Sequence, residues 1–213
     1  VLWEKSFVIG DRITDYKLAE NLGIKALLIK NYDDFSGLDQ SLVFNSWNEI
    51  SNYLLFSSRK EKVKRKTKET EIEVEINLDG KGMADIQTGL GFFDHMLEQI
   101  SRHAQIDLKI RAQGDLHIDE HHLIEDTAIT LGLAFDKALG DKRGIERYGF
   151  LLPMDEAEAQ VSLDFSGRPY LVFNAEFKRD YINGFPTEMT KHFFKSFSDA
   201  ARLNLNIQVD GEN

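Results

Sequence analysis

Two stretches of the chain repeat one pattern at a constant offset of 97 residues, and this constrains the fold more than any other feature. In each stretch a histidine is followed by a helical pattern, an alternating apolar strand and a glycine. The first runs from His95 to Gly114 and the second from His192 to Gly211. The apolar strand positions coincide under the same offset, with Ile106, Leu108 and Ile110 matching Leu203, Leu205 and Ile207. We interpret the agreement as an internal duplication, which predicts two similar structural halves.

The first copy continues beyond its glycine into the motif His121-His122-x-x-Glu125, whereas the second copy stops two residues after Gly211. A genuine duplication predicts a second His-His-x-x-Glu just beyond Asn213. Because the chain also opens at Val1 rather than at a methionine, we expect it to be an internal part of a longer protein.

Composition excludes several classes of protein. The chain has 213 residues, enough for one or two domains, and 42% of them are hydrophobic, which suffices for a buried core. A net charge of −10 argues against a nucleic-acid partner. The absence of cysteine excludes disulfides, thiolate zinc sites and cysteine nucleophiles. No apolar run is long enough for a membrane span and no signal peptide opens the chain, so we expect a cytoplasmic protein without a membrane partner.

A sharp change in composition suggests a domain boundary. Seven of the eleven residues at 58–68 are Lys or Arg. We predict a solvated basic linker at 58–64, with a polyanion-binding patch as the alternative, and a second domain at 65–213. The preceding segment, 1–57, shows strand, helix and strand patterns at 6–9, 15–22 and 24–29, followed by a helix at 48–56. Such an order predicts a parallel α/β arrangement.

The second segment predicts an α+β fold in which helices pack on a largely antiparallel sheet, because its strands and helices do not alternate in regular βαβ units. Asp79-Gly80 predicts a hairpin turn after the first of these strands. Strands are expected at 71–78, 106–112, 158–165, 170–176 and 204–209, and helices at 92–104, 121–139 and 187–203.

The paired histidines give the strongest chemical signal. On a helix, residues three or four positions apart share a face, so either His121 or His122 can stand beside Glu125. Adjacent histidines point about 100° apart, which suits two different metal ions better than one. Imidazole with carboxylate favours Mn, Fe or Zn. A lone histidine on a helix is more often structural, but the repeat makes His95 and His192 further candidate ligands.

Other polar residues have weaker signals. Asp94 and Asp126 each stand next to a candidate ligand, His95 and Glu125, and are hypothetical orienters of those ligands. The turn-like segments 141–147 and 166–169 contain arginines whose planar fork matches phosphate when several converge. Arginines in turns are more often simply solvated. His103 and His117 receive no functional assignment.

Together these motifs closely resemble imidazoleglycerol-phosphate dehydratase, and the resemblance covers 65–213. The residues that carry it are Arg65-x-Thr67-Lys68-Glu69-Thr70, Gly91-Phe92-Phe93-Asp94-His95-Met96-Leu97, Gly114-Asp115-Leu116-x-Ile118-Asp119-x-His121-His122-x-x-Glu125-Asp126, Asp141-Lys142-Arg143-Gly144-Ile145 and Ser166-Gly167-Arg168-Pro169. The segments Val8-Ile9-Gly10-Asp11-Arg12-x-Thr14-Asp15 and Ala19-Glu20-Asn21-x-Gly23-Ile24 resemble the last motif of a haloacid-dehalogenase-type histidinol phosphatase. The chain thus resembles the middle of a fusion of these two enzymes, with the C-terminal part of the α/β phosphatase at 1–57.

The resemblance implies roles for individual residues. His95, His121, His122, Glu125 and His192 match the ligands of two Mn²⁺ ions. Glu69 matches a carboxylate at the substrate, and Arg147 and Arg168 match groups that bind the substrate's phosphate. Asp11 matches a Mg²⁺ ligand of the phosphatase and Asp15 its acidic companion; the remaining phosphatase groups would precede Val1. The resemblance further implies a homo-oligomer of 24 subunits whose metal sites are completed across subunit interfaces.

The implied reaction removes water from imidazole glycerol phosphate, a small-molecule phosphate, and yields imidazole acetol phosphate. Glu69 or Glu125 would act as the general acid–base group, and the sequence does not choose between them. Two alternatives stay open: a dinuclear metal-dependent phosphohydrolase, and a metal-stabilised assembly module without catalysis. Phosphate release would distinguish the first alternative, and a metal site indifferent to a substrate-like triazole would distinguish the second.

Overall fold

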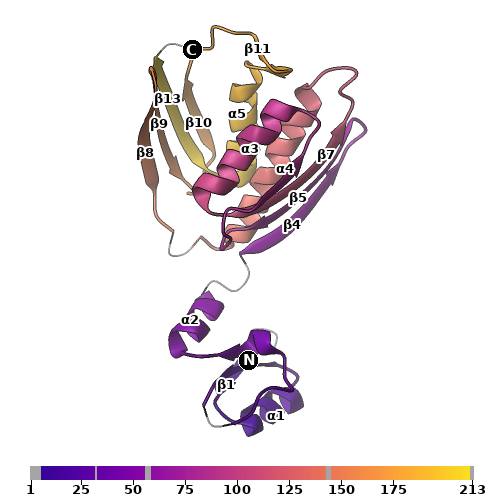
Figure 1. The fold of residues 1–213 in the computed structure, drawn as a ribbon, viewed down its shortest axis with the longest axis vertical. Helices are drawn as coiled ribbons and strands as arrows, with labels where there is room; N and C mark the ends of the chain where they lie inside the picture. Colours follow the sequence, from indigo (N-terminus) through magenta and orange to yellow (C-terminus); the bar gives the residue numbers. More distant parts are fainter. Residues whose placement is uncertain (1–5, 32, 56–58, 143–144, 212–213) are drawn as a thin grey trace. The chain divides into compact units, whose positions relative to one another are not determined.

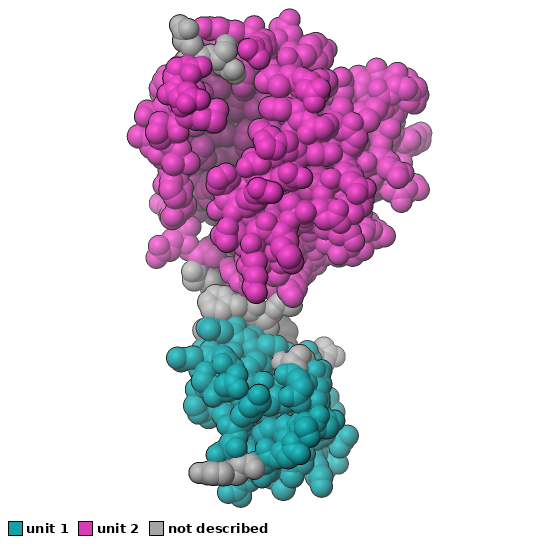
Figure 2. Space-filling model, in the orientation of Figure 1, with its two compact units in different colours: residues 1–57 teal, residues 58–213 magenta. Residues whose placement is uncertain are grey.

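The structure, a computed structural model, describes residues 6–31, 33–55, 59–142 and 145–211. The chain divides into two compact units, residues 1–57 and 58–213, which are coloured separately in Figure 2. Among the described residues, no helix combines the length and the apolar character needed to cross a membrane.

The first unit is a small parallel α/β structure. Strands β1 (Phe7–Gly10), β2 (Lys25–Ile29) and β3 (Val43–Phe44) form a parallel sheet in that order. Helix α1 (Ile13–Leu22) connects the first two strands and ends at Gly23, whose φ of 65° lies in the left-handed region that favours glycine. A 3₁₀ turn, η2 (Gln40–Leu42), precedes β3, and α2 (Trp47–Leu55) follows it. The predicted parallel strand pair is confirmed.

The second unit contains two four-stranded sheets with three helices between them, as Figure 1 shows. One sheet has the order β4-β5-β7-β6 and the other β10-β13-β9-β8. A short hairpin, β11-β12, precedes the last helix. The strands are β4 (Lys60–Lys66), β5 (Thr70–Asn77), β6 (Ala84–Gln87), β7 (Asp107–Gly114), β8 (Tyr148–Met154), β9 (Ala157–Asp164), β10 (Tyr170–Asn174), β11 (Tyr181–Ile182), β12 (Phe185–Pro186) and β13 (Asn204–Gly211), and the helices are α3 (Gly91–Ala104), α4 (His121–Leu139) and α5 (Met189–Ala201).

The two sheets share one topology. Read from β4 and from β8, both have two antiparallel pairings followed by a parallel one. Fine detail repeats at the same offset of 97. The Ser101 hydroxyl donates to the Ile106 carbonyl at 2.7 Å, and the Ser198 hydroxyl donates to the Leu203 carbonyl at 2.7 Å. This agreement is what the repeat in the sequence predicts.

The repeat also extends to strands that the sequence pattern did not reveal. Val63 faces Val74 across β4 and β5, and Phe150 faces Val161 across β8 and β9, which gives an offset of 87 residues. The hairpin β11-β12, inserted before α5 in the second half, accounts for the change from 87 to 97. Strand β8 was not predicted, because its apolar residues form an almost continuous run without alternation.

The predicted basic linker is wrong. Lys60–Lys66 forms strand β4, which pairs with β5 along its whole length, so the second unit begins before Arg65. Outward lysines meet glutamates of β5: Lys62 binds Glu73 at 2.6 Å, and Lys64 binds the same carboxylate. Because of these two lysines, the pKa of Glu73 falls to about 2. A polyanion-binding patch is not favoured either, since these charges are neutralised across strands; residue 58 lies outside the described residues.

The hairpin predicted at Asp79-Gly80 is also wrong. Strand β5 pairs with β4 and β7, while β6 runs parallel to β7 on its far side. The Asp107 carboxylate organises the crossing segment, because it accepts the backbone N–H groups of Lys81 at 2.8 Å and Met83 at 3.1 Å. A turn signal in sequence indicates where the chain bends but does not identify the strand that it pairs with next.

Helices α4 and α5 approach each other closely at Gly132. A Cβ atom at this position would lie 2.7 Å from the Ala200 Cβ and 2.8 Å from both the Ala201 nitrogen and the Phe197 carbonyl oxygen. Two of these neighbours are backbone atoms, which cannot move aside without displacing the helix. The contact therefore requires glycine and sets how α5 packs on α4.

We predict that Gly132→Ala lowers the free energy of unfolding of the second unit by about 1–3 kcal/mol, the usual cost of overpacking. The loss should appear although alanine favours helix over glycine. Urea denaturation measures it. Gly149→Ala is the control, because the nearest atom to its added Cβ lies 3.6 Å away. Equal stability of the two variants would contradict the proposed tight contact.

Candidate metal and substrate site

Three predicted ligands come together at one place. His121 and Glu125 lie one turn apart on α4, and His192 approaches from α5. The Glu125 carboxylate oxygen Oε1 lies 3.2 Å from Nε2 of His121 and 3.0 Å from Nδ1 of His192. The candidate ligand atoms of all three residues lie within 4.8 Å of one another. Two imidazoles and a carboxylate fit a Mn²⁺, Fe²⁺ or Zn²⁺ ion.

Local interactions explain this convergence. The Asp119 carboxylate accepts the backbone N–H of His121 at 2.9 Å, which fixes the start of α4. Beyond its exposed first turn, α4 is buried in the core on several sides, through Leu123, Ile124, Ala128 and Leu131. On α5, Phe193 follows His192 directly and packs edge-on against Phe93, with ring centroids 5.6 Å apart. The histidines thus stand at the edge of a packed aromatic core.

His122 lies outside this three-residue cluster, as expected for adjacent helical residues that point in different directions. Its Nδ1 atom lies 3.3 Å from an Asp115 carboxylate oxygen. That hydrogen bond is the main cause of a raised pKa of His122, with smaller contributions from the charges of Asp115, Asp119 and Glu69. Such a partner on Nδ1 leaves Nε2 available to a metal. Local spacing does not predict a role for Asp115, because it stands seven residues before His122 across a turn.

His95 is not part of the cluster either. It is exposed on α3, where the Gln99 side-chain amide lies 3.4 Å from its Nδ1 atom. The repeat makes His95 the counterpart of His192. His95 therefore occupies in the first half the position that a residue of the ligand cluster occupies in the second half.

The hypothetical orienting roles of Asp94 and Asp126 are not what the structure shows. Asp94 accepts the backbone N–H of Thr88 at 2.8 Å and its hydroxyl at 2.6 Å, and so holds the segment before α3. Asp126 binds Arg65 and the two threonines of the turn between β4 and β5. Both carboxylates organise neighbouring backbone segments rather than imidazole rings.

Glu69 occupies that same turn and is exposed. The hydrogen bond from the neighbouring Thr70 hydroxyl to Asp126, at 2.5 Å, holds this turn against α4 next to Glu125. The charge of Glu69 makes the smallest of the contributions that raise the pKa of His122. The structure thereby brings together a proposed substrate-binding carboxylate and a proposed metal ligand from segments more than fifty residues apart.

The two predicted phosphate-binding arginines lie elsewhere. Arg147 and Arg168 line an open hollow of about 580 Å³ on the outer face of the second sheet, together with neutral polar residues such as Ser162 and Asn206. The Arg147 Nε lies 2.9 Å from an Asp164 carboxylate oxygen. Arg168 has no side-chain ion pair among the described residues.

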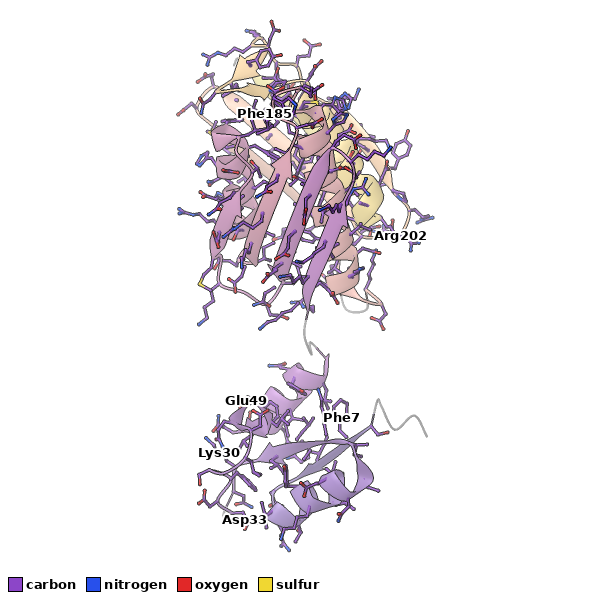
Figure 3. All side chains as sticks on the ribbon, turned by 90° about the vertical axis from the view of Figure 1, so that its right-hand side faces the viewer. Phe7, Lys30, Asp33, Glu49, Phe185 and Arg202 are labelled. Carbon is purple, nitrogen blue, oxygen red and sulfur yellow. The ribbon has the colours of Figure 1, made fainter. Side chains whose placement is uncertain are left out.

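The hollow is far from the metal-ligand cluster. The Arg202 guanidinium, just after α5, reaches the Gly167 carbonyl at 3.4 Å, so the arginine-bearing turn lies at the carboxyl end of this helix. His192 stands near the other end, and the ten residue steps from His192 to Arg202 span about 15 Å along the helix. Figure 3 shows Phe185, just before α5, and Arg202 well apart along the unit. The hollow and the metal-ligand cluster therefore lie toward opposite ends of α5.

In the first unit, Asp11 directly follows β1 at the carboxyl end of the parallel sheet. Its Oδ2 atom accepts the Asn31 side-chain amide at 2.7 Å. Asp15 accepts the backbone N–H of Arg12 at 3.0 Å and so helps to start α1. The predicted Mg²⁺ role of these two residues stays a prediction.

The fold and site define an α+β protein with two topologically alike halves and a histidine–carboxylate metal-ligand cluster. Residues 88–213 match the family model described as imidazoleglycerol-phosphate dehydratase. A Staphylococcus aureus imidazoleglycerol-phosphate dehydratase structure has a TM-score of 0.65 at 33% identity, covering 72% of this chain and 85% of its own. For the Pyrococcus furiosus enzyme in complex with (S)-C348, the TM-score is 0.61 at 34% identity, with coverage of 71% and 81%. The chain belongs to the imidazoleglycerol-phosphate dehydratase family, a family of hydro-lyases.

A curated relative extends the similarity to the first unit. The histidine biosynthesis bifunctional protein HisB of Spirosoma linguale is 59% identical over 98% of this chain. The similar protein of Bacteroides fragilis is 55% identical over 99%. The chain spans about 58% of the length of each of these relatives.

We predict that Asp115→Asn lowers the pKa of His122 in metal-free protein, because the chief cause of its upward shift is removed. The imidazole then loses its proton at a lower pH. NMR titration of the ring nitrogens measures this. Asp119→Asn is the control and should cause a smaller decrease, since Asp119 contributes to the pKa of His122 through its charge alone and asparagine keeps an oxygen that can accept the His121 N–H. An unchanged His122 titration in Asp115→Asn would contradict the observed pairing.

Proposed function

We propose that this chain carries the catalytic scaffold of a dehydratase of histidine biosynthesis, which converts imidazole glycerol phosphate into imidazole acetol phosphate. The observation that carries the proposal is the convergence of His121, Glu125 and His192 in a member of this family. A cytoplasmic location is part of the same proposal.

The metal is proposed to be Mn²⁺, with two ions for each complete site. His121, Glu125 and His192 would hold one ion, while His122 and His95 would contribute to sites with ligands from other segments or subunits. By the internal repeat, the partner of His95 would be the second His-His-x-x-Glu motif, which we expect after Asn213. When bound, the metal withdraws electron density from the substrate's imidazole ring and favours its anionic form.

Glu69 is the better candidate for proton transfer. Glu125 has one carboxylate oxygen directed at both His121 and His192, which suits a metal ligand. Glu69 is exposed on the turn that Asp126 holds against α4, and among the described residues no ion pair joins its carboxylate to a candidate ligand. Its carboxyl group would deliver a proton to the hydroxyl on the ring-attached carbon, which departs as water. The resulting carboxylate would then accept the proton of the next carbon, and the enol formed tautomerises to the ketone.

We predict that Glu69→Gln and Glu125→Gln fail in different ways. Glu69→Gln should lower kcat by about 10²- to 10⁴-fold, the usual share of a general base, and leave the Mn²⁺ content unchanged. Glu125→Gln should lose both Mn²⁺ and turnover. Metal analysis and a product assay on protein expressed from the complete gene measure these effects.

Glu71→Gln is the matched control, because Glu71 is exposed and pairs only with Lys66 on the outer side of the hairpin. It should retain full activity. Release of inorganic phosphate that persists when Asp11 of the proposed phosphatase domain is replaced by Asn would favour the dinuclear hydrolase instead. A protein without activity, whose Mn²⁺ affinity does not change when a triazole substrate analogue is added, would favour the metal-stabilised assembly module.

We further propose that the active protein is a homo-oligomer, of 24 subunits by family resemblance, in which arginines of one copy serve the metal site of another. The separation of Arg147 and Arg168 from His192 along α5 supports this arrangement. A phosphate group at the hollow and an imidazole ring at the cluster would then belong to one substrate held between copies.

A comparison of the two sheets supports the same proposal. The outer face of the first sheet carries charges that pair across strands, and most of the equivalent positions of the second sheet are uncharged; the exceptions, Arg147 and Glu158, correspond to Lys60 and Glu71. The charged positions are Lys62, Lys64, Glu73, Glu75, Asp85, Lys109 and Arg111, and their counterparts are Gly149, Leu151, Gln160, Ser162, Val172, Asn206 and Gln208. Because charges are depleted from the centres of protein interfaces, the second face is the better candidate for contact with another copy.

We predict that Asn206→Lys shifts the protein from its full assembly to smaller species, because a buried unpaired charge opposes association. Light scattering after size-exclusion chromatography measures the mass. Gln87→Lys is the control, since it adds the same charge to the outer face of the first sheet and should leave the assembly intact. An unchanged mass for Asn206→Lys would contradict the assigned face.

For residues 1–57 we propose an origin in a haloacid-dehalogenase-type histidinol phosphatase domain. The parallel β1-α1-β2 order and the position of Asp11 at the carboxyl end of β1 support this, because open α/β sheets bind ligands at that edge. The printed names of the relatives as bifunctional proteins agree with a fusion. Asp11 would hold Mg²⁺ and Asp15 would assist it in the complete domain.

A further inference from the structure

The turn that presents Glu69 has an unusual source of support. Residues 67–69 join β4 and β5, and the Thr67 N–H donates to the Thr70 carbonyl at 2.9 Å, which leaves Lys68 and Glu69 as the two residues at the tip of the loop. Two-residue hairpin loops ordinarily use turns in which one or both loop residues have positive φ. Neither Lys68 nor Glu69 is among the described residues with positive φ. This loop therefore relies on something other than the usual backbone geometry.

Threonine side chains provide part of the support. The Thr67 hydroxyl oxygen accepts the backbone N–H groups of Glu69 at 3.2 Å and Thr70 at 3.0 Å. The hydroxyl groups of Thr67 and Thr70 lie 3.1 Å apart. The backbone of Glu69 is thus tied directly to the Thr67 side chain.

Asp126 supplies the remaining support from α4. Its side chain is largely buried, and its Oδ1 atom accepts the Arg65 Nε at 3.0 Å. Its Oδ2 atom accepts the Thr70 hydroxyl at 2.5 Å and lies 3.4 Å from that of Thr67. One carboxylate therefore contacts donors from both strands that flank the turn. Hydrogen bonds to a charged, buried acceptor are among the stronger ones in proteins.

We infer that Asp126 is a positioning residue, which holds the Glu69 turn in register with the metal-ligating end of α4. Glu125 and Asp126 are consecutive, so neighbouring residues of one helix bind the metal and anchor the turn. The inference rests on the proposed role of Glu69 in proton transfer. Its physical basis is that a displacement of about 1 Å at a reacting group can cost about 10²-fold in rate.

The decisive variant is Asp126→Asn, which keeps the side chain's size but replaces one acceptor oxygen with a donor. We expect kcat to fall about 10- to 100-fold, with little change in KM and an unchanged Mn²⁺ content, because His121, Glu125 and His192 all remain. In a Glu69→Gln background the same substitution should cost little further activity, since the group to be positioned is gone. Multiplicative losses in the double variant would overturn the inference.

Threonine variants test the same network without touching α4. Thr70→Ser keeps the hydroxyl and should keep most of the activity, whereas Thr70→Val removes it and should resemble Asp126→Asn. Asp107→Asn is the matched control: this carboxylate also holds a loop, through the N–H groups of Lys81 and Met83, but in a crossing segment away from the Glu69 turn. It should lower thermal stability and leave kcat unchanged. A comparable loss of kcat in Asp107→Asn would mean that the Asp126 network is only structural.

The experiment separates this inference from the proposed function. Full activity of Glu69→Gln would contradict the proposed role of Glu69 itself. An inactive Glu69→Gln beside a fully active Asp126→Asn would contradict only the positioning role.

Discussion

The close packing of α5 on α4 is the contact on which the candidate site depends. At Gly132 the two helices come so near that a single added carbon would meet backbone atoms. This packing carries His192 to the Glu125 carboxylate, which also faces His121. Because the ligands come from two helices, neither helix alone forms a metal site, and the spacing of the helices decides whether the three side chains converge.

Around this contact, largely or partly buried carboxylates connect side chains of different segments. Asp126 ties the hairpin carrying Glu69 to α4, and Asp115 pairs with His122. These groups are acceptors placed among donors, and in a partly buried setting such pairs restrict geometry more than they add stability. The first sheet shows the opposite use of charge: its outward lysines and glutamates pair with one another and leave a neutralised, hydrated face.

Much of the second unit was predictable from local patterns. Helix α4 has the predicted bounds, 121–139, because its apolar spacing is regular and Gly140 follows it. The repeat anticipated that α3–β7 and α5–β13 would be alike, and the structure extends the likeness to whole sheets. Strand β4 was missed because a run of lysines looks like a solvated segment until the glutamates of β5 are placed beside it.

The sequence by itself determined the helices, the repeated pattern and the residue types able to bind a metal, since these depend on periodicity and on side-chain chemistry along one segment. Only the tertiary structure decided that His121, Glu125 and His192 converge while His95, Arg147 and Arg168 stay apart. It also showed that Asp126 faces a turn and not an imidazole. The reason is physical: convergence of distant residues depends on how helices and sheets pack, and local spacing contains no information about the partner surface.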